Sequence, residues 1–283
     1  IVFGDWSSDV CSSDLSMPDS TLGEMIEVAR RFGYDGLEPR IDLGHAHGIE
    51  VAIDANARRA IVDRMAASGI ELGCLATSLH YADPSFADQV VRESHERIDL
   101  AGDLGVPVLR VFGGKIPEGL SREAAIDTMV RLLASIADYA AERNVRLCIE
   151  THDDWCDPRH VAAVLRRVDH PAVAVNWDIM HPVRVCNYTM DEAFEVLKPW
   201  IRHVHVHDGM GPGKATFKAI GTGDIDQMMP IGTGGIDHRR ALQLLRGIDY
   251  QGYLSGEWIR WEPYEVHLPR ELATLRKYEA ELT

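Results

Sequence analysis

Hydrophobic positions along the chain alternate between two periodicities. Stretches with an apolar residue every three to four positions, typical of amphipathic helices, alternate with short apolar runs, typical of buried strands. From residue 20 onward this alternation predicts successive βαβ units with parallel strands. The predicted strands cover residues 36–40, 70–77, 107–112, 145–150, 172–178, 201–207 and 253–257. The predicted helices cover residues 20–32, 56–67, 85–104, 121–143, 158–167, 191–197 and 237–246, and a last helix begins near residue 268.

Seven strands with interleaved helices predict an α/β fold, a (β/α)8 TIM barrel that requires one more strand before residue 20. A doubly wound open sheet is the competing architecture, but it needs a Gly-rich phosphate turn after an early strand, which this sequence does not have. Residues 5–15 resemble a translated sequencing adapter, and the alternative is a Ser- and Asp-rich disordered tail. Both interpretations predict that residues 1–17 are a tail without fixed structure. We therefore expect a single barrel domain over residues 18–283, with its first strand missing or replaced by a non-native N-terminal segment.

A Gly-rich segment follows the predicted strand 201–207. Residues 209–237 contain a near repeat, IGTGDID and IGTGGID, which is too short to indicate a solenoid. The segment is either a mobile lid over the strand ends or a long surface loop. Lys214 and Lys218 in this segment are either candidates for contact with an anionic substrate or ordinary exposed lysines without a specific role.

Composition limits the partners of this chain. With 44 acidic and 29 basic residues its formal charge is -15, which disfavours nucleic acid and anionic membrane surfaces as partners. No apolar run approaches the roughly 20 residues that cross a bilayer, and the N-terminus lacks the pattern of a signal peptide. The five cysteines show neither a paired framework nor a C-x-x-C spacing, so we expect reduced thiols and a cytoplasmic location.

Four residues with metal-binding side chains lie at the ends of four predicted strands. Glu150, Asp178 and Glu257 each close a strand, and His205 lies on another. In a (β/α)8 barrel the carboxyl ends of the strands meet at one face, where active sites are built. Three carboxylates and an imidazole that converge there repel and desolvate one another unless a cation neutralises them. The arrangement therefore predicts one divalent metal ion.

The segments around these residues carry a resemblance to a known family. They are CIETHDD (148–154), NWDIMHP (176–182), HVHVHD (203–208), GTGGID (232–237) and SGEW (255–258). In order and spacing they resemble the motifs of the xylose isomerase-like TIM barrel family, from about residue 20 to the C-terminus. The resemblance implies that Glu150, Asp178, His205 and Glu257 bind one Mn, Mg, Co or Zn ion. It also implies that Glu150 and Glu257 act as the catalytic acid/base pair.

Other residues near these motifs are candidates for contacts with a substrate. The resemblance assigns His181 this role, because it follows Asp178 by three positions. Family members often have a lysine where this chain has His207, so the role of that lysine does not carry over. The full set of expected substrate-binding residues is His181, His152, Arg184, His207, His80 and Trp258.

Two further polar groups are expected to be structural. His203 alternates with His205 and His207 on one strand, so all three point to the same face, and we expect His203 to be a packed core histidine. Glu38 and Arg110 are expected to face the barrel interior and to form an ion pair with each other.

The resemblance favours a sugar isomerase or epimerase that transfers a proton through a metal-stabilised enediolate. The same residues suit a dehydratase of the inosose or 3-dehydroshikimate type, which expels a β-hydroxyl group. Phosphodiester cleavage as in endonuclease IV would need more metal ligands and a basic surface. A non-catalytic sugar-binding barrel would leave the acidic quartet unexplained. We expect a small carbohydrate as the partner, and the sequence leaves homo-oligomerisation open.

Overall fold

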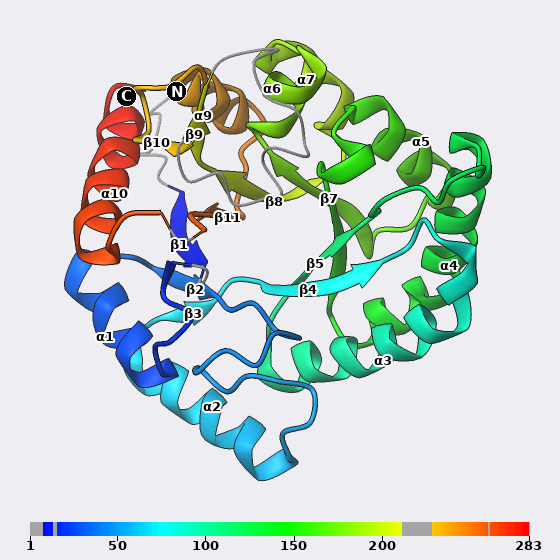
Figure 1. The fold of residues 1–283 in the computed structure, drawn as a ribbon. Helices are drawn as coiled ribbons and strands as arrows, with labels where there is room; N and C mark the ends of the chain where they lie inside the picture. The colour runs from blue at the N-terminus through cyan, green and yellow to red at the C-terminus, as the bar shows by residue number, and fades with distance from the viewer. Residues whose placement is uncertain (1–7, 14–15, 211–227, 260, 283) are drawn as a thin grey trace.

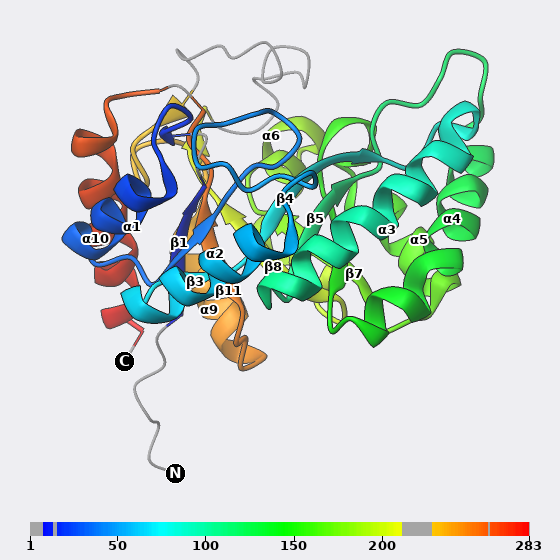
Figure 2. The same ribbon diagram turned by 90° about the horizontal axis from the view of Figure 1, so that it is seen from below.

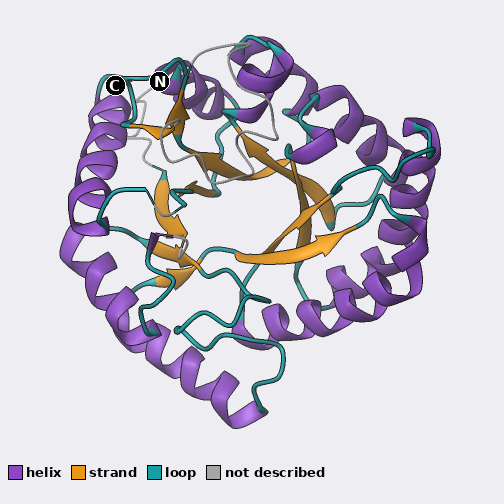
Figure 3. Cartoon of the chain, in the orientation of Figure 1, coloured by secondary structure: helices purple, strands orange, loops and turns teal. Residues whose placement is uncertain are grey.

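The fold is described from a computed structural model, in which residues 8–13, 16–210, 228–259 and 261–282 are placed. A ring of strands is surrounded by helices, with the chain running from strand to helix around it (Figures 1, 2 and 3). The helices are α1 (Leu22–Phe32), α2 (Ala55–Ser68), α3 (Ala87–Leu104), α4 (Arg122–Glu142), α5 (Pro158–Val168), α6 (His181–Cys186), α7 (Met190–Leu197), α9 (His238–Gly247) and α10 (Tyr264–Ala280).

The strands of the ring are parallel. Within the described residues they form one sheet in the order β3-β2-β1-β11-β8-β7-β6-β5-β4. Their bounds are β1 (Asp9–Ser13), β2 (Gly36–Glu38), β3 (Glu71–Leu72), β4 (Leu75–His80), β5 (Val108–Phe112), β6 (Arg146–Glu150), β7 (Val173–Asp178), β8 (Ile201–Val206) and β11 (Tyr253–Gly256). A short antiparallel pair, β9 (Asp208–Gly209) and β10 (Met228–Met229), lies after β8.

The predicted strand 70–77 is split into β3 and β4, which closes the ring. β3 pairs with β2, and β4 pairs with β5. Arg40, just beyond β2, forms a parallel bridge with Ala76 of β4. The two halves of this one strand are therefore the first and last strands of the sheet order, so the ring closes and the predicted (β/α)8 barrel is confirmed.

The N-terminal segment differs from the sequence prediction. Asp9–Ser13 form β1, which pairs in parallel with β11 on one side and with β2 on the other. The expectation of no fixed structure is therefore wrong for these five residues. The physical reason is that Val10 and Cys11 are fully buried between neighbouring strands, which supply the contacts that the short segment lacks by itself. The segment occupies the place of the barrel's first strand.

Local signals explain most helix boundaries. The side chain of Thr21 caps α1 in a reciprocal capping box with Glu24, and Gly33 ends the helix with a φ of 88°. The last helix begins at Tyr264, earlier than the predicted residue 268. Pro269 lies inside this helix, and Pro263 is its N-cap. Proline is common in the first turn of a helix, so Pro269 is compatible with a start near residue 268. The observed start is about one turn earlier, directly after Pro263.

One large cluster of buried apolar side chains joins the strands to the helices around them. The buried side chains also include polar ones, such as Glu38, Arg110 and His203. All five cysteines are free thiols, as predicted, and four of them are buried. Among the described helices, none combines the length and apolar character that spanning a membrane requires.

Candidate metal centre and active site

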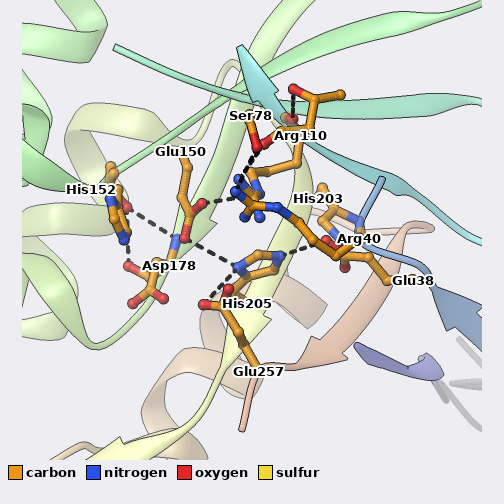
Figure 4. Close-up of polar contacts among 12 residues, drawn as sticks. Glu38, Arg40, Ser78, Arg110, Glu150, His152, Asp178, His203, His205 and Glu257 are labelled. Carbon is orange, nitrogen blue, oxygen red and sulfur yellow. Dashed lines mark hydrogen bonds and ion pairs between the residues drawn. The ribbon is translucent and has the colours of Figure 1, made fainter. Parts of the chain in front are cut away.

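Glu150, Asp178, His205 and Glu257 converge at the carboxyl ends of adjacent strands (Figure 4). Glu150 ends β6, Asp178 ends β7, His205 lies on β8, and Glu257 directly follows β11. Strand register sets their height in the barrel, because Asp178 is paired with His205, and His205 is paired with Ser255, two residues before Glu257. One ligand atom from each of the four residues lies within 4.8 Å of the others, and all four side chains are buried. The structure thus brings the predicted quartet together.

Three carboxylates hold the imidazole of His205. Its Nδ1 atom lies 3.2 Å from Oε1 of Glu150 and 3.4 Å from Oε2 of Glu257. Its Nε2 atom lies 3.0 Å from Oε1 of Glu38 on β2. Burial disfavours the charged ring, but the three carboxylates outweigh burial and raise the pKa of His205 well above its usual value. Glu38 therefore orients the ring so that Nδ1 faces the quartet.

Glu38 and Arg110 do not pair with each other, which corrects the sequence prediction. Nε of Arg110 lies 3.2 Å from Oε2 of Glu150, and both side chains are fully buried. Glu38 instead contacts the Nε2 atom of His203 at 2.8 Å, in addition to His205. The register explains the difference, because β5 adjoins β6, whose last residue is Glu150. His203 is buried as predicted, and its partner is Glu38.

Neighbouring positive groups keep the quartet's carboxylates ionised. Burial and the nearby Glu257 oppose the charge on Glu150, yet His205 and Arg110 outweigh them and lower its pKa. Burial also opposes the charge on Glu257, but His205 and Arg110 lower its pKa as well. For Asp178 the opposing effect of burial is outweighed by the neighbouring imidazoles, among them His207, whose Nε2 lies 2.6 Å from Oδ2 of Asp178. All three carboxylates are thus available as anionic ligands.

The donor set fits a divalent metal ion. Three anionic carboxylates and one imidazole nitrogen are the ligand types that Mn, Mg, Co and Zn bind. Oε2 of Glu150 is buried and accepts no hydrogen bond among the described residues, although Arg110 lies within ion-pair distance. A cation at the centre of the quartet would offset the mutual repulsion of its carboxylates.

Three histidines expected to contact substrate line the neighbouring part of the site. Nε2 of His207 contacts Oδ2 of Asp178 at 2.6 Å, and Nε2 of His181 lies 3.6 Å from the same oxygen. The rings of His152 and His181 are 5.1 Å apart between centroids. Burial lowers the pKa of His181 to about 4, so its ring is neutral at pH 7. These histidines also lie near enough to Glu150 and Asp178 to serve as ligands, so potential ligands extend beyond the quartet.

The other expected substrate-binding residues lie in different surroundings. His80, at the end of β4, stacks on Phe112 with ring centroids 5.1 Å apart. Arg184 lies in α6, is buried, and donates from Nη1 to the sulfur of Met180. Trp258 is buried and packs against His267 of α10.

The Gly-rich segment after β8 is described only at its two ends. Residues 211–227, with Lys214 and Lys218, lie outside the described residues, as does the first copy of the near repeat. The second copy is organised by the buried Asp208, whose carboxylate accepts hydrogen bonds from the backbone N–H groups of Gly232, Gly234 and Ile236.

Sequence reasoning missed two residues beside the quartet, Arg40 and Phe112. The guanidinium carbons of Arg40 and Arg110 lie 5.4 and 4.1 Å from the centroid of the Phe112 ring. Phe112 ends β5, so its position at a strand end was the available signal. Arg40 lies two residues beyond β2, where the sequence alone gives no sign of its neighbours.

Comparison with known proteins finds a family model and two relatives that match this chain. The model of the xylose isomerase-like TIM barrel family matches residues 26–278. A Xenopus laevis protein named "Putative hydroxypyruvate isomerase" is 22% identical over 195 residues, which cover 62% of this chain and 63% of that protein. An uncharacterised protein of Methanocaldococcus jannaschii is 24% identical over 170 residues, which cover 57% of this chain and 54% of that protein. The chain thus matches less than two thirds of each relative's length.

Solved structures share the fold. The probable 3-DHS dehydratase AsbF from Bacillus anthracis is 18% identical with a TM-score of 0.78, over 95% of this chain and 98% of that chain. A structure of L-ribulose 3-epimerase is 17% identical with a TM-score of 0.74, over 98% and 96%. The IOLI protein, solved with a zinc atom, is 19% identical with a TM-score of 0.75, over 97% of both chains. The same barrel therefore occurs in an epimerase and in a probable dehydratase.

Proposed function

Because the chain belongs to the xylose isomerase-like TIM barrel family, we propose that it is a divalent-metal-dependent isomerase or epimerase of a small carbohydrate or a related hydroxy-ketone. The observation that carries this proposal is the convergence of Glu150, Asp178, His205 and Glu257 within 4.8 Å of one another. Relatives of this fold include an epimerase and a protein named as an isomerase, which supports the same class of reaction.

In this proposal the four converging residues hold one ion, which is Mn, Mg, Co or Zn. When bound, the ion would withdraw electron density from the substrate oxygens and so favour loss of a neighbouring proton. Glu38 keeps the ring of His205 in position, since it occupies Nε2 and leaves Nδ1 to face the ion.

The proton transfer is assigned to Glu150 and Glu257. One oxygen of each glutamate lies close to the same nitrogen, Nδ1 of His205, at 3.2 Å for Glu150 and 3.4 Å for Glu257. Both carboxylates have lowered pKa values, so both are anionic before the reaction and either can accept a proton. One glutamate removes the proton next to the carbonyl group and is thereby protonated. The other, once it has taken up a proton from solvent, returns a proton to the substrate to complete isomerisation or epimerisation, and the first then releases its proton to solvent.

The remaining polar residues are assigned to substrate binding. His181, His152 and His207 adjoin the quartet and can donate or accept hydrogen bonds with substrate hydroxyl groups. His80 and Trp258 would contribute walls of the site, and Arg184 would contribute a donor from α6. A neutral His181 suits this role, because it binds a hydroxyl group without adding charge beside Asp178.

A dehydratase would use the same residues but expel a hydroxyl group after the proton is removed. The two reactions differ in their products. In deuterium oxide an isomerase or epimerase incorporates deuterium into the recovered sugar, whereas a dehydratase releases water and forms an unsaturated or deoxy product.

The first test is metal content in the purified protein and in the Glu257→Gln and Asp178→Ala variants. Glu71→Gln is the matched control, because Glu71 lies on β3 and pairs with Tyr253 rather than with the quartet. We expect about one ion per chain in the wild type and the control, and a loss of most of it in the two site variants. Deuterium uptake into a panel of ketoses then identifies the reaction. A wild type that binds none of Mn, Mg, Co or Zn would refute the proposal and favour a sugar-binding barrel.

A further inference from the structure

A second group of potential metal ligands lies inside the barrel, below the quartet. One ligand atom from each of Glu38, Cys74 and His203 lies within 4.8 Å of the other two. Glu38 ends β2, Cys74 lies between β3 and β4, and His203 lies on β8, two residues before His205. All three side chains are fully buried. None of them belongs to the quartet, although Glu38 also contacts His205 (Figure 4).

The positions of these atoms suit three ligands of one ion. Nε2 of His203 lies 2.8 Å from Oε2 of Glu38. Two ligands at about 2.0–2.2 Å from a tetrahedral zinc ion are roughly 3.3–3.6 Å apart, and a thiolate at about 2.3 Å lies slightly farther from both. An ion between Glu38 and His203 therefore requires shifts of less than about 1 Å, and it stays within reach of Cys74.

Polar atoms beside this group lack hydrogen-bond partners. Nδ1 of His203 is buried and has no partner among the described residues. The same holds for both amide atoms of Asn176, which is fully buried on β7 and in register with His203. Asn176 faces the interior with Asp178, two residues later on the strand, and Ala174, two residues earlier, packs in one small cluster with Cys74. A buried amide without partners is costly, so this position calls for a ligand that the amide oxygen can bind.

We propose that Glu38, Cys74 and His203 bind a second metal ion, a zinc ion, and that Oδ1 of Asn176 completes a tetrahedral set. A carboxylate, a thiolate, an imidazole and an amide oxygen suit zinc or cobalt, whereas Mg and Mn favour oxygen ligands and disfavour a thiolate. With Mg or Mn only the quartet is occupied, whereas Zn or Co adds the interior ion.

Four protein ligands and full burial leave this ion no open position for a substrate, which is typical of structural zinc sites. The ion would join β2, β7, β8 and the connection between β3 and β4 across the barrel interior. It would also hold Oε2 of Glu38 while Oε1 of the same carboxylate contacts His205, so it would support the quartet from behind. Burial raises the pKa of Cys74 well above its usual value, so the ion must displace the thiol proton, which leaves to solvent.

Cobalt provides the test, because a thiolate bound to Co gives a sulfur-to-metal charge-transfer absorption in the near ultraviolet. The quartet contains no sulfur and cannot give this absorption. Cobalt is supplied during expression, since the interior site is closed to solvent, and cobalt content and the spectrum are measured on the purified protein. Cys74→Ser removes the thiolate. Cys148→Ser is the matched control, because Cys148 is equally buried and packs in the same cluster as Cys74.

We expect about two cobalt ions per chain and the charge-transfer absorption in the wild type and in Cys148→Ser, and about one ion without the absorption in Cys74→Ser. Cys186→Ser removes the one cysteine that is not fully buried, and it should behave as the wild type. A wild type without the absorption would overturn the proposal, whether or not any variant folds. An absorption that persists in Cys74→Ser, or that disappears in Cys148→Ser or Cys186→Ser, would also overturn it.

Glu257→Gln separates this inference from the proposed function. The variant should lose the quartet's ion and keep the charge-transfer absorption. One cobalt ion per chain that gives the absorption and is retained in Glu257→Gln would support the interior site and refute the metal centre of the proposed isomerase. One ion that gives no absorption and is lost in Glu257→Gln would support the quartet and refute the interior site.

Discussion

Glu38 shows how one buried side chain controls a site to which it contributes no proposed ligand. Its two oxygens contact Nε2 of His205 at 3.0 Å and Nε2 of His203 at 2.8 Å. Because the ring of His205 can present only its other nitrogen to the quartet, Glu38 determines both the orientation of the ring and which nitrogen is free to coordinate.

Replacement of Glu38 by glutamine should therefore weaken metal binding while the four proposed ligands remain. The loss of a carboxylate behind a ligating histidine typically lowers metal affinity about 10- to 100-fold. Competition titration of Co or Zn against a chelator measures the change. Glu71→Gln serves as the control, and equal affinities for the two variants would contradict the assigned role of Glu38.

Gly256 limits the residues that can precede Glu257. A Cβ atom at Gly256 would lie 1.9 Å from the buried ring of Trp258, whereas a Cβ atom at Gly247 would meet nothing within 4 Å. Gly256→Ala should therefore displace Trp258 and Glu257, lower the free energy of unfolding by about 1–3 kcal/mol and reduce metal content.

Gly247→Ala is the matched control for that substitution, because Gly247 lies at the end of α9 with open space around it. Urea unfolding and metal analysis of both variants measure the difference. We expect Gly247→Ala to keep its metal and to be at least as stable as the wild type, since alanine favours helix. A Gly256→Ala variant with wild-type stability and metal content would show that the site tolerates the added atom.

The helices and strands that were predicted correctly are those with a clear local sequence signal. The apolar periodicity located most helices and strands, and it placed Glu150, Asp178 and Glu257 at strand ends because each follows an apolar run. The partner of Arg110 was not predictable in this way. Alternation along a strand shows which face a side chain occupies, but the height of residues on the neighbouring strand depends on the register of the whole barrel.

Asp157 is a charged residue at the start of α5, and the contribution of its charge to stability can be tested. It is the N-cap of α5, accepts a hydrogen bond from the backbone of Arg159, and accepts another from the hydroxyl group of Tyr188 at 2.8 Å. Burial opposes its charge, but these bonds and the Arg159 side chain lower the pKa of Asp157 to about 2. Its stabilising effect is thus present above the unfolded-state pKa of about 3.9 and is lost as the pH falls towards 2.

Asp157→Ala should lower the free energy of unfolding by about 0.5–2 kcal/mol at pH 7, as for other lost N-caps. The difference from the wild type should narrow at pH 3, because most of the carboxyl group is then protonated in the unfolded state, where its pKa is about 3.9. Urea unfolding at pH 7, 4 and 3 tests both statements. Asp138→Ala, at a side chain that is 95% exposed, should change stability little, and a gap that widens on acidification would contradict the assignment.

Closure of the whole barrel depends on residues 9–13, which the local sequence pattern assigns to a tail. β1 contains only two apolar residues, Val10 and Cys11, so its sequence gives no strand signal of its own. Its position is determined by distant partners, since β2 and β11 flank it and Arg276 of α10 donates a hydrogen bond to the backbone oxygen of Ser8. Such non-local contacts are invisible in a local pattern.

Val10→Asp tests whether this segment completes the barrel. Val10 is fully buried opposite Leu254 of β11, so an aspartate there would place an unpaired charge in the interior. We expect the free energy of unfolding to fall by more than about 3 kcal/mol, a cost typical of an uncompensated buried charge. Denaturant unfolding, followed by circular dichroism, measures the loss.

Asp9→Asn is the matched control, because Asp9 is the exposed first residue of the same strand. Partial desolvation of its carboxyl group and the nearby Asp35 and Glu71 raise the pKa of Asp9, so removing the charge should leave stability unchanged or increase it. Equal unfolding midpoints for Val10→Asp and the wild type would mean that residues 9–13 are not held between β2 and β11. A lower unfolding midpoint for Val10→Asp would show that β1 is held in the barrel by contacts with its neighbouring strands. The sequence of β1 itself contributes little more than two buried side chains, whereas the other seven strands have clear sequence signals.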